Sequence, residues 1–318
     1  MTIDPNNRPG GPNLVLTAKS ADKLQFFDAA TLAKTAEIDM PASTHELIRS
    51  LDGKTLYGSV YGGGIFGKNK DPDRRIAVID LASKSLARTI DVGDNFAPHS
   101  LMMDARGTLW STAELGNAVL AIDPATGAVE RIALGDSPHW IAISHASGKL
   151  FASFKTKEAV AVVDIEQRRM IGTIPIPHGA EGIAVSPDGW ALFVCAHRKG
   201  VVHVFDTRTQ ALHRTLAIDG APGEVNQLRR VRVSPDGRHV CVSSHVDNYT
   251  AIYDGFKFDQ ITGFTTPKAP MGFGFAADGQ HALLCCHDAA VTLEFELSRG
   301  RITRQFDTAA GCEFVISY

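Results

Sequence analysis

The sequence lacks the long apolar segments and the one-sided charge that mark several large classes of protein. No apolar run approaches the roughly 18 residues that a membrane-spanning helix needs. The formal net charge of −3 over 318 residues provides no basic surface for nucleic acid or for an anionic membrane. The first residues, MTIDPNNRPGGPN, have neither the basic start nor the apolar stretch of a secretory signal. We therefore expect a cytoplasmic protein.

Cysteine is also scarce, and its spacing argues against a covalent or metal framework. The chain has five cysteines, an odd number, and no C-x-x-C pair, which is a poor basis for disulfides or for a zinc site. Cys285 and Cys286 are adjacent, so on a strand their side chains point to opposite faces and cannot readily share a metal. We expect buried free thiols.

What the sequence has in abundance is a repeated pattern of short strands. In residues 181–206, EGIAVSPDGWALFVCAHRKGVVHVFD, apolar residues recur at every second position around a Ser-Pro-Asp-Gly turn, which predicts antiparallel strands. Pro187 favours the turn, and Gly189 accepts the left-handed conformation that closes it. Seven such repeats, at intervals of 40 to 54 residues, predict a seven-bladed β-propeller. Their first strands begin at His45, His99, His139, Glu181, Arg229, Met271 and Glu313.

The two ends of the chain are predicted to share one blade. Residues 14–40 supply three strands without an innermost one, whereas 313–317 form a first strand that is followed by nothing. Pairing them would close the ring and remove its open edges. We therefore expect an all-β fold: a single seven-bladed β-propeller domain over residues 1–318, closed by the C-terminal strand completing the N-terminal blade, with a loose arm at 1–13.

The repeats resemble those of a known propeller family. The segments that carry the resemblance are PHWIAIS at 138–144, EGIAVSPDG at 181–189 and RVRVSPDG at 230–237. They are similar to the YVTN/YncE-like seven-bladed propellers, which include lactonase-like members. The resemblance covers nearly the whole chain and implies the fold. For function it implies a range: 6-phosphogluconolactonase-like hydrolases, muconate-lactonising enzymes, metal-dependent lyases and binding proteins.

Aligning the repeats places polar residues at two equivalent positions on one face of the propeller. The start of each first strand should lie beside the end of the second strand, because the two run antiparallel. We call the seven strand starts given above the first-strand ring. Titratable residues fill 13 of the 14 positions in the two rings, and they include six of the 12 histidines. The second-strand ring consists of Lys19, Tyr61, Glu114, Lys155, His197, His245 and His287.

These rings predict chemistry rather than packing alone, although a histidine at such a position can also serve only to bond a neighbouring blade. His45, His99 and His139 come from adjacent blades, and three imidazoles with a carboxylate form a ligand set for a divalent ion such as zinc, manganese, iron or copper. Imidazoles also suit proton transfer at neutral pH, and an arginine can hold a carboxylate or an oxyanion. The predicted catalytic residues are His197, His245, His287, Arg229, Glu181 and Glu313. The predicted substrate-binding residues are Lys19, Tyr61, Glu114, Lys155 and Met271. Glu46, next to His45, is expected to point the other way.

The sequence thus predicts a metal-assisted hydrolase or lyase that acts on a small oxygenated substrate, by opening or closing a lactone ring or by C–O elimination. Insertions at 61–75 and 220–230, both at the ring end of the strands, would cover the substrate. Metal-free acid–base catalysis by the same residues is an alternative within this class. The alternative outside it is a non-catalytic ligand-binding or protein-interaction propeller. Nucleic acid and membrane are not expected as partners, and a monomer is compatible with the pattern.

Overall fold

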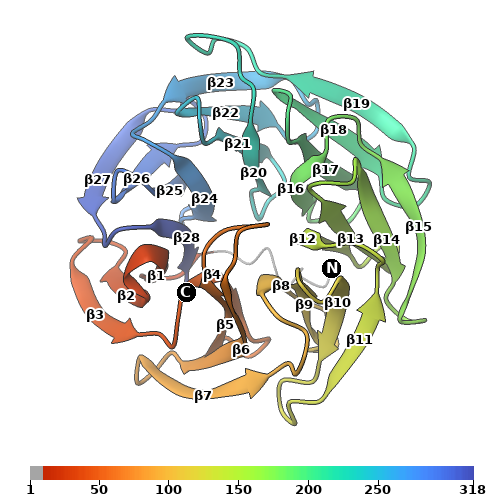
Figure 1. Cartoon of the computed structure of the whole chain (residues 1–318). Helices are drawn as coiled ribbons and strands as arrows, with labels where there is room; N and C mark the ends of the chain where they lie inside the picture. The colour runs from red at the N-terminus through yellow and green to blue at the C-terminus, as the bar shows by residue number, and fades with distance from the viewer. Residues whose placement is uncertain (1–9) are drawn as a thin grey trace.

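The structure, a computed structural model, describes residues 10–318 as seven four-stranded antiparallel sheets around a central axis (Figure 1). Each sheet is one blade, so the predicted seven-bladed β-propeller is confirmed. Most of the predicted loose arm, residues 1–9, lies outside the described residues, and Asn13 already belongs to the first strand. Among residues 10–318, no helix has the length and apolar character needed to cross a membrane.

The blades follow the chain in order, and within blades 2 to 7 the strands run from the axis outwards. Blade 1 contains β28 (Cys312–Ser317), β1 (Asn13–Ala18), β2 (Lys23–Asp28) and β3 (Lys34–Asp39), with the 3-10 helix η1 (Lys19–Ala21) after β1. Blade 2 contains β4 (Thr44–Arg49), β5 (Thr55–Gly63), β6 (Asp71–Asp80) and β7 (Ser85–Asp91). Blade 3 contains β8 (Pro98–Met103), β9 (Leu109–Ala113), β10 (Ala118–Ile122) and β11 (Val129–Ala133). Blade 4 contains β12 (Pro138–Ser144), β13 (Lys149–Phe154), β14 (Ala159–Asp164) and β15 (Arg169–Pro175). Blade 5 contains β16 (Ala180–Val185), β17 (Ala191–Ala196), β18 (Val201–Asp206) and β19 (Leu212–Ala217). Blade 6 contains β20 (Leu228–Val233), β21 (His239–Ser244), β22 (Tyr249–Asp254) and β23 (Gln260–Thr265). Blade 7 contains β24 (Pro270–Phe275), β25 (His281–Cys286), β26 (Val291–Glu296) and β27 (Ile302–Asp307).

Blade 1 joins the two ends of the chain, as the sequence predicts. Strand β28 pairs antiparallel with β1, and Leu14 lies opposite Ser317 in this register. The hydrogen bonds between these strands are therefore what closes the ring. Apolar side chains reinforce the seam, since Leu16 of β1 and Val315 of β28 belong to one buried cluster with Leu283 of blade 7. Strand β28 thus gives blade 1 the innermost strand that each other blade takes from its own continuous stretch of chain.

The hydrophobic core lies between neighbouring blades. Strands with apolar residues at alternate positions present one apolar row to each adjacent blade. Between blades 5 and 6, for example, Phe193 and Val204 form one buried cluster with Val231 and Val242. All five cysteines are buried free thiols, as predicted. Because each blade covers the next, this packing fixes the orientation of the sheets. Their innermost strands lie around the axis.

A β-bulge occurs in the innermost strand of every blade, at the position of the first-strand ring. In blade 2, Thr44 pairs with Val60 and Leu47 pairs with Gly58, so His45 and Glu46 together lie opposite the single residue Ser59. A bulge breaks the strict alternation of side chains and re-aims them. The bulges therefore determine which side chains face the axis.

The first insertion forms an ordered extension of the blade 2 hairpin. Strands β5 and β6 continue pairing to Gly63 and Asp71, which carries the hairpin tip over the axis (Figure 1). Gly64 has a φ of +124°, a conformation that favours glycine. The tip places Phe66 against His139, with ring centroids 4.9 Å apart. The insertion thus supplies an apolar cover for the ring residues.

Candidate functional site

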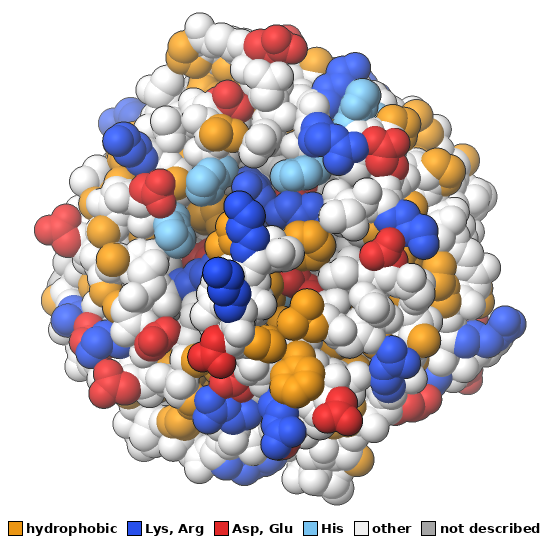
Figure 2. All heavy atoms as spheres, in the orientation of Figure 1, with side chains coloured by type: hydrophobic (Ala, Val, Ile, Leu, Met, Phe, Trp, Pro, Cys, Tyr) orange, Lys and Arg blue, Asp and Glu red, His pale blue; other side chains and the backbone are white. Residues whose placement is uncertain are grey.

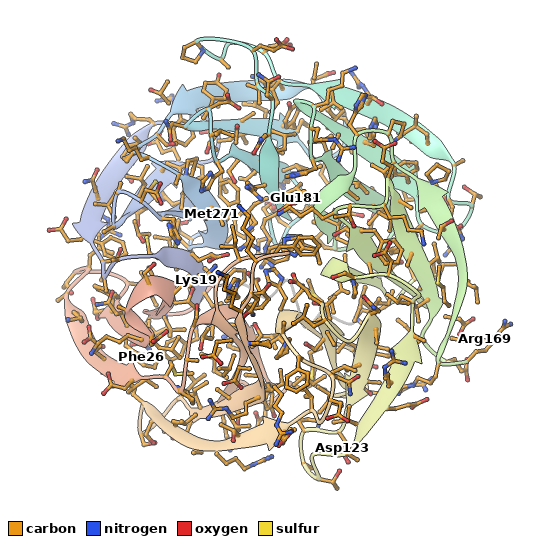
Figure 3. All side chains as sticks on the ribbon, in the orientation of Figure 1. Lys19, Phe26, Asp123, Arg169, Glu181 and Met271 are labelled. Atoms are coloured by element: carbon orange, nitrogen blue, oxygen red, sulfur yellow. The ribbon has the colours of Figure 1, made fainter. Side chains whose placement is uncertain are left out.

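The two rings predicted from the sequence meet at a cavity on the propeller axis. The cavity has a volume of about 220 Å³, and on the face that Figure 2 shows, histidine, lysine and arginine side chains gather around the centre. Figure 3 shows Lys19, Glu181 and Met271 close to the axis, although they come from different blades. Eleven ring residues line the cavity: Lys19, His45, His99, His139, Lys155, Glu181, Arg229, His245, Met271, His287 and Glu313. The sequence-based convergence of these residues is therefore seen in the structure.

The other three ring residues lie behind the cavity wall. Tyr61 and Glu114 are buried, and the Tyr61 hydroxyl donates a hydrogen bond of 2.6 Å to Glu114 Oε2. His197 contacts Glu181, with 3.3 Å between Nδ1 and Oε2. These side chains hold lining residues in place and do not themselves form the cavity surface.

A hydroxyl in the second strand fastens the bulge in several blades. Thr112 Oγ1 accepts a hydrogen bond of 2.9 Å from the Ser100 amide inside the bulge of its own blade. The same oxygen donates one of 3.1 Å to the carbonyl of His139, the ring residue of the next blade. Ser59 links Glu46 and the His99 carbonyl in the same way. Each hydroxyl thus fixes the bulge in one blade and the ring residue of the next.

We call this pair of hydrogen bonds, from the bulge amide and to the carbonyl of the next blade, the hydroxyl clamp. A sequence pattern marks it that strand alternation alone does not reveal. The residue two positions before each second-strand ring position carries a hydroxyl or a thiol in all seven repeats: Thr17, Ser59, Thr112, Ser153, Cys195, Ser243 and Cys285. Hydroxyls of this type can accept from a bulge amide and donate to a carbonyl at once. A small polar residue on an otherwise apolar strand would have indicated where each bulge lies.

His139 is held between two glutamates. Its Nδ1 lies 2.5 Å from Glu114 Oε1, and its Nε2 lies 3.3 Å from Glu181 Oε1. Burial by itself would lower the pKa of His139, but the carboxylates of Glu181 and Glu114 outweigh it and raise the pKa. Because both ring nitrogens face carboxylates, His139 fits the role of an imidazolium in an ion-pair network.

Glu181 is the centre of the cationic side of the cavity. Lys155 Nζ lies 3.1 Å from Oε2, and Arg229 Nη1 lies 3.3 Å from Oε1. Burial opposes ionisation of Glu181, but His139, Lys155 and Arg229 together hold its pKa well below the usual value. Three basic side chains, His139, Lys155 and Arg229, thus surround one carboxylate, so positive charge exceeds negative charge around Glu181. Within the described chain, Nε of Arg229 is buried without a hydrogen-bond partner, which leaves one donor of its guanidinium unused.

The opposite side of the cavity holds His45, His99 and Glu313, and its imidazoles are neutral. Burial lowers the pKa of both histidines well below the usual value. His99 Nδ1 lies 3.1 Å from the carbonyl of His139, to which it can donate. Burial opposes ionisation of Glu313, but the cationic side chains of Lys19 and Arg230 lower its pKa. Neutral imidazoles beside an ionised carboxylate can bind a cation or accept a proton.

Two groups of side chains among residues 10–318 bring at least three potential metal-ligand atoms within 4.8 Å of one another. One is His45, His99 and Glu313, and the other is His99, Glu114 and His139. Each group contains only two of the three histidines that the sequence assigned to a metal. The three histidines are therefore divided between two groups, each of which includes one glutamate.

Arg230, Trp140 and Glu46 were not predicted at the site. Arg230 is buried under the cavity, 3.6 Å from the Trp140 ring centre, and bonds Glu46 (2.9 Å) and Glu313 (3.2 Å). Burial raises the pKa of Glu46 to about 7 despite Arg230. Strict alternation predicted that Glu46 would point away from the ring side chains. In the structure Glu46 is buried and forms an ion pair with Arg230, and unlike His45 it does not line the cavity.

The sequence predicted that the histidines of blades 5 to 7 would both donate and accept protons at neutral pH, but two of them have a lowered pKa. Burial lowers the pKa of His197 to about 4, and burial followed by the charge of Arg229 lowers the pKa of His245. His287 pairs with Asp288, 2.8 Å from Nδ1 to Oδ1. At neutral pH, His197 and His245 are therefore proton acceptors, suited to general-base rather than general-acid work.

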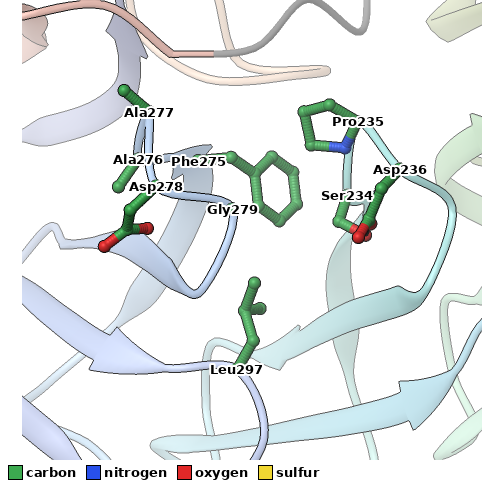
Figure 4. A pocket seen from close by; sticks show the side chains of 9 residues that line it. All are labelled: Ser234, Pro235, Asp236, Phe275, Ala276, Ala277, Asp278, Gly279 and Leu297. Atoms are coloured by element: carbon green, nitrogen blue, oxygen red, sulfur yellow. Dashed lines mark hydrogen bonds between the residues drawn. The ribbon is translucent and has the colours of Figure 1, made fainter.

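A second cavity, of about 280 Å³, lies at the other end of blades 6 and 7 (Figure 4). Two Ser-Pro-Asp-Gly-like turns form it, and Phe275, Pro235 and Leu297 give it a largely apolar lining. Its titratable side chains are Asp236 and Asp278. Asp236 is taken up by its own turn, where it accepts from Ser234 Oγ (2.6 Å). This cavity lacks the converging charges of the axial one.

Comparison with known proteins gives the fold and leaves the function open. No protein-family model matches the sequence. Antigen Lp49 of Leptospira interrogans is 24% identical over 274 residues, which are 78% of this chain and 56% of that protein. The chain therefore spans about half the length of this curated relative.

Solved structures share the architecture across nearly the whole chain. Hydrazine synthase of Kuenenia stuttgartiensis has a TM-score of 0.76 and 18% identity, covering 98% of this chain and 97% of that one. A candidate 6-phosphogluconolactonase of Bacteroides fragilis has a TM-score of 0.74 and 16% identity, covering 95% and 96%. The dihydro-heme d1 dehydrogenase NirN has a TM-score of 0.68 and 13% identity, covering 97% and 75%. At these identities the likeness establishes the propeller, and function must be argued from the site.

Proposed function

We propose that this propeller is an enzyme, a hydrolase or lyase that acts on a small oxygenated substrate in the axial cavity. The observation that carries the proposal is the concentration of ionisable groups in one 220 Å³ cavity, with neutral imidazoles on one side and surplus cations on the other. A cavity with perturbed titratable groups is the usual mark of a catalytic site. The lactonase-like resemblance of the YVTN/YncE-type repeats supports ring opening or closing of a lactone.

Arg229 and Lys155 are proposed to bind negative charge on the substrate or in the transition state. Both reach the cavity and share Glu181 as their counter-ion, so an incoming oxyanion would meet donors that are already oriented. His245, the neutral imidazole beside Arg229, is proposed to accept the proton from water or from a substrate carbon. A divalent metal, when bound at the histidines of blades 2 and 3, would polarise a carbonyl or acidify water.

The test is a turnover screen with the purified, metal-supplemented protein on small lactones and on hydroxy acids that can eliminate water. Ring opening is followed by proton release, and elimination by absorbance of the new double bond. We expect His245→Gln to reduce kcat/KM by roughly 10²-fold or more, as the loss of a general base does. His213→Gln, on the exposed face of β19, is the matched control and should retain full activity.

A folded, metal-loaded protein that turns over neither substrate class would contradict the proposal. Equal activity of the His245→Gln and His213→Gln variants would contradict the role of His245 and leave the reaction class standing. Unfolding curves of both variants separate loss of chemistry from loss of structure.

A further inference from the structure

We propose that His45, His99 and Glu313 form a binding site for one divalent transition-metal ion, and that Glu313 takes the third ligand position that sequence reasoning gave to His139. The inference deepens the proposed function and rests on it only for the use to which the metal is put. Its basis is the state of each potential ligand atom in the structure: which are already bonded, and which are buried without a partner.

His99 is oriented as a metal ligand would be. Its Nδ1 lies 3.1 Å from the carbonyl oxygen of His139, so this nitrogen carries the proton and donates it there. The lone pair is then on Nε2. Metal-binding histidines generally donate their other N–H to a carbonyl or carboxylate, which fixes the ring. Thr112 donates to the same carbonyl, so the acceptor itself is held in place.

The ring nitrogens of His45 are free to bind a metal, because they make no hydrogen bond to the described residues. Both are buried, and neither has a hydrogen-bond partner among residues 10–318. The ring is 3% exposed and lies 4.8 Å from the ring of His99, centre to centre. A buried polar atom without a partner costs about 1–3 kcal/mol, so an atom in this position requires an explanation. A metal bond to one of the nitrogens would supply it.

Glu313 is placed to complete the set. Its Oε1 accepts a hydrogen bond of 3.2 Å from Arg230 Nη2, and a carboxylate oxygen has a second lone pair to offer. The same oxygen lies 3.6 Å from His45 Nδ1, close to the roughly 3.4 Å that separates two ligand atoms around a tetrahedral ion with bonds of about 2.1 Å. Within the described residues, its Oε2 is buried without a hydrogen bond and has Lys19 at 3.5 Å. Two imidazoles and one carboxylate are a common set in catalytic zinc sites, which keep a further position for water or substrate.

The competing group, His99 with Glu114 and His139, is already satisfied. Glu114 accepts from the Tyr61 hydroxyl on Oε2 and contacts His139 on Oε1. His139 faces Glu114 with one nitrogen and Glu181 with the other. A metal here would have to displace a glutamate from His139, because each imidazole nitrogen can bond only one partner and both already face a carboxylate. The same argument removes His139 from the three-histidine set.

The proposed ligands lie among basic and acidic side chains. Arg230 and Lys19 are cationic, and both contact Glu313. Glu46 bonds Arg230 from the other side and supplies a second carboxyl group. The two basic side chains thus face two carboxyl groups, and the imidazoles add no charge when a metal binds them. Nitrogen and carboxylate ligands of this kind suit zinc, iron or manganese rather than calcium.

The test is direct metal binding by the full-length protein. Metal-free protein is titrated with Zn²⁺ by calorimetry and with Co²⁺ by visible absorbance, and we expect about one equivalent of either ion, as for a single built site. The variants His45→Gln, His99→Gln and Glu313→Gln should each lose this binding. His139→Gln is the matched control: it removes an equally buried histidine from the same cavity and should still bind one equivalent.

X-ray absorption at the zinc edge of the unmodified protein keeps the test decisive if a buried variant fails to fold. Two imidazoles and an oxygen ligand support the proposal, whereas three imidazoles would restore the set with His139 and overturn it. Absence of stoichiometric binding, or loss of binding in His139→Gln with retained folding, would also overturn it. Metal binding without turnover would leave this site standing and contradict the proposed enzymatic function alone.

Discussion

The hydroxyl clamp that holds the bulge in several blades leads to a quantitative prediction for Thr112→Val. Thr112 is fully buried, and valine keeps its shape while removing the hydroxyl. The His139 carbonyl would retain a partner, because His99 also donates to it. The Ser100 amide has Thr112 as its acceptor and is buried, so it would lose its bond. Leaving one buried amide unsatisfied costs about 1–3 kcal/mol, which is the destabilisation that we expect.

Equilibrium unfolding in urea measures this change. The midpoint of Thr112→Val should fall while the slope of the transition stays that of the unmodified protein, as expected when stability changes and the exposed surface does not. The control is Thr262→Val on the outer strand β23, where the hydroxyl makes one bond of 3.4 Å to a backbone carbonyl. Its effect should stay within about 0.5 kcal/mol. A Thr112→Val protein as stable as this control would refute the clamp.

Three further predictions concern the cavity and the outer strands of blade 7. Arg230→Met should cost about 3–5 kcal/mol in unfolding free energy, because it leaves buried carboxylates unpaired. Adding Glu46→Gln should recover part of that loss, and a simply additive loss would contradict the pairing. Phe66→Ala should speed deuterium exchange at the His139 ring in mass spectrometry, since the phenyl ring covers it; an unchanged rate would argue against a cover. Glu294 has its pKa lowered by hydrogen bonds from Arg304 and Thr303, against burial, so it adds stability above its unfolded value of 4.5 that is lost as the pH falls. Glu294→Gln should therefore show a shallower loss of stability below that pH, and identical acid slopes would contradict it.

The strands and the ring closure were predictable because they depend on short sequence patterns that recur in each repeat. Period-two alternation, the turn at Pro187 and Gly189, and the unmatched strand at the C-terminus all act within a few residues. Seven copies of the pattern then average out the ambiguity of any one. The convergence of the ring residues followed from antiparallel geometry alone.

The pairing of side chains across blades was not predictable in the same way. Whether His139 meets Glu114 and Glu181, or instead meets two histidines, depends on side-chain directions that the bulge sets and on the distance between neighbouring blades. Strict alternation also gives no reason to expect Arg230, the neighbour of the ring residue Arg229, at the cavity, where it pairs with Glu46. The small polar residue before each second-strand ring position was visible in the sequence, but its meaning depends on the bulge that it fastens.

The cavity is asymmetric although its scaffold repeats seven times. The bulge recurs in every blade and the hydroxyl clamp in several, so each blade offers one ring side chain from its first strand and one from its second. Blades 2 and 3 use those places for imidazoles whose pKa burial lowers, whereas blades 4 and 6 place Lys155 and Arg229 around Glu181. A substrate in between would meet lone pairs on one side and N–H donors on the other. That polarity would orient an oxygenated molecule with its negative end toward Arg229, and it requires only that different residues occupy equivalent positions.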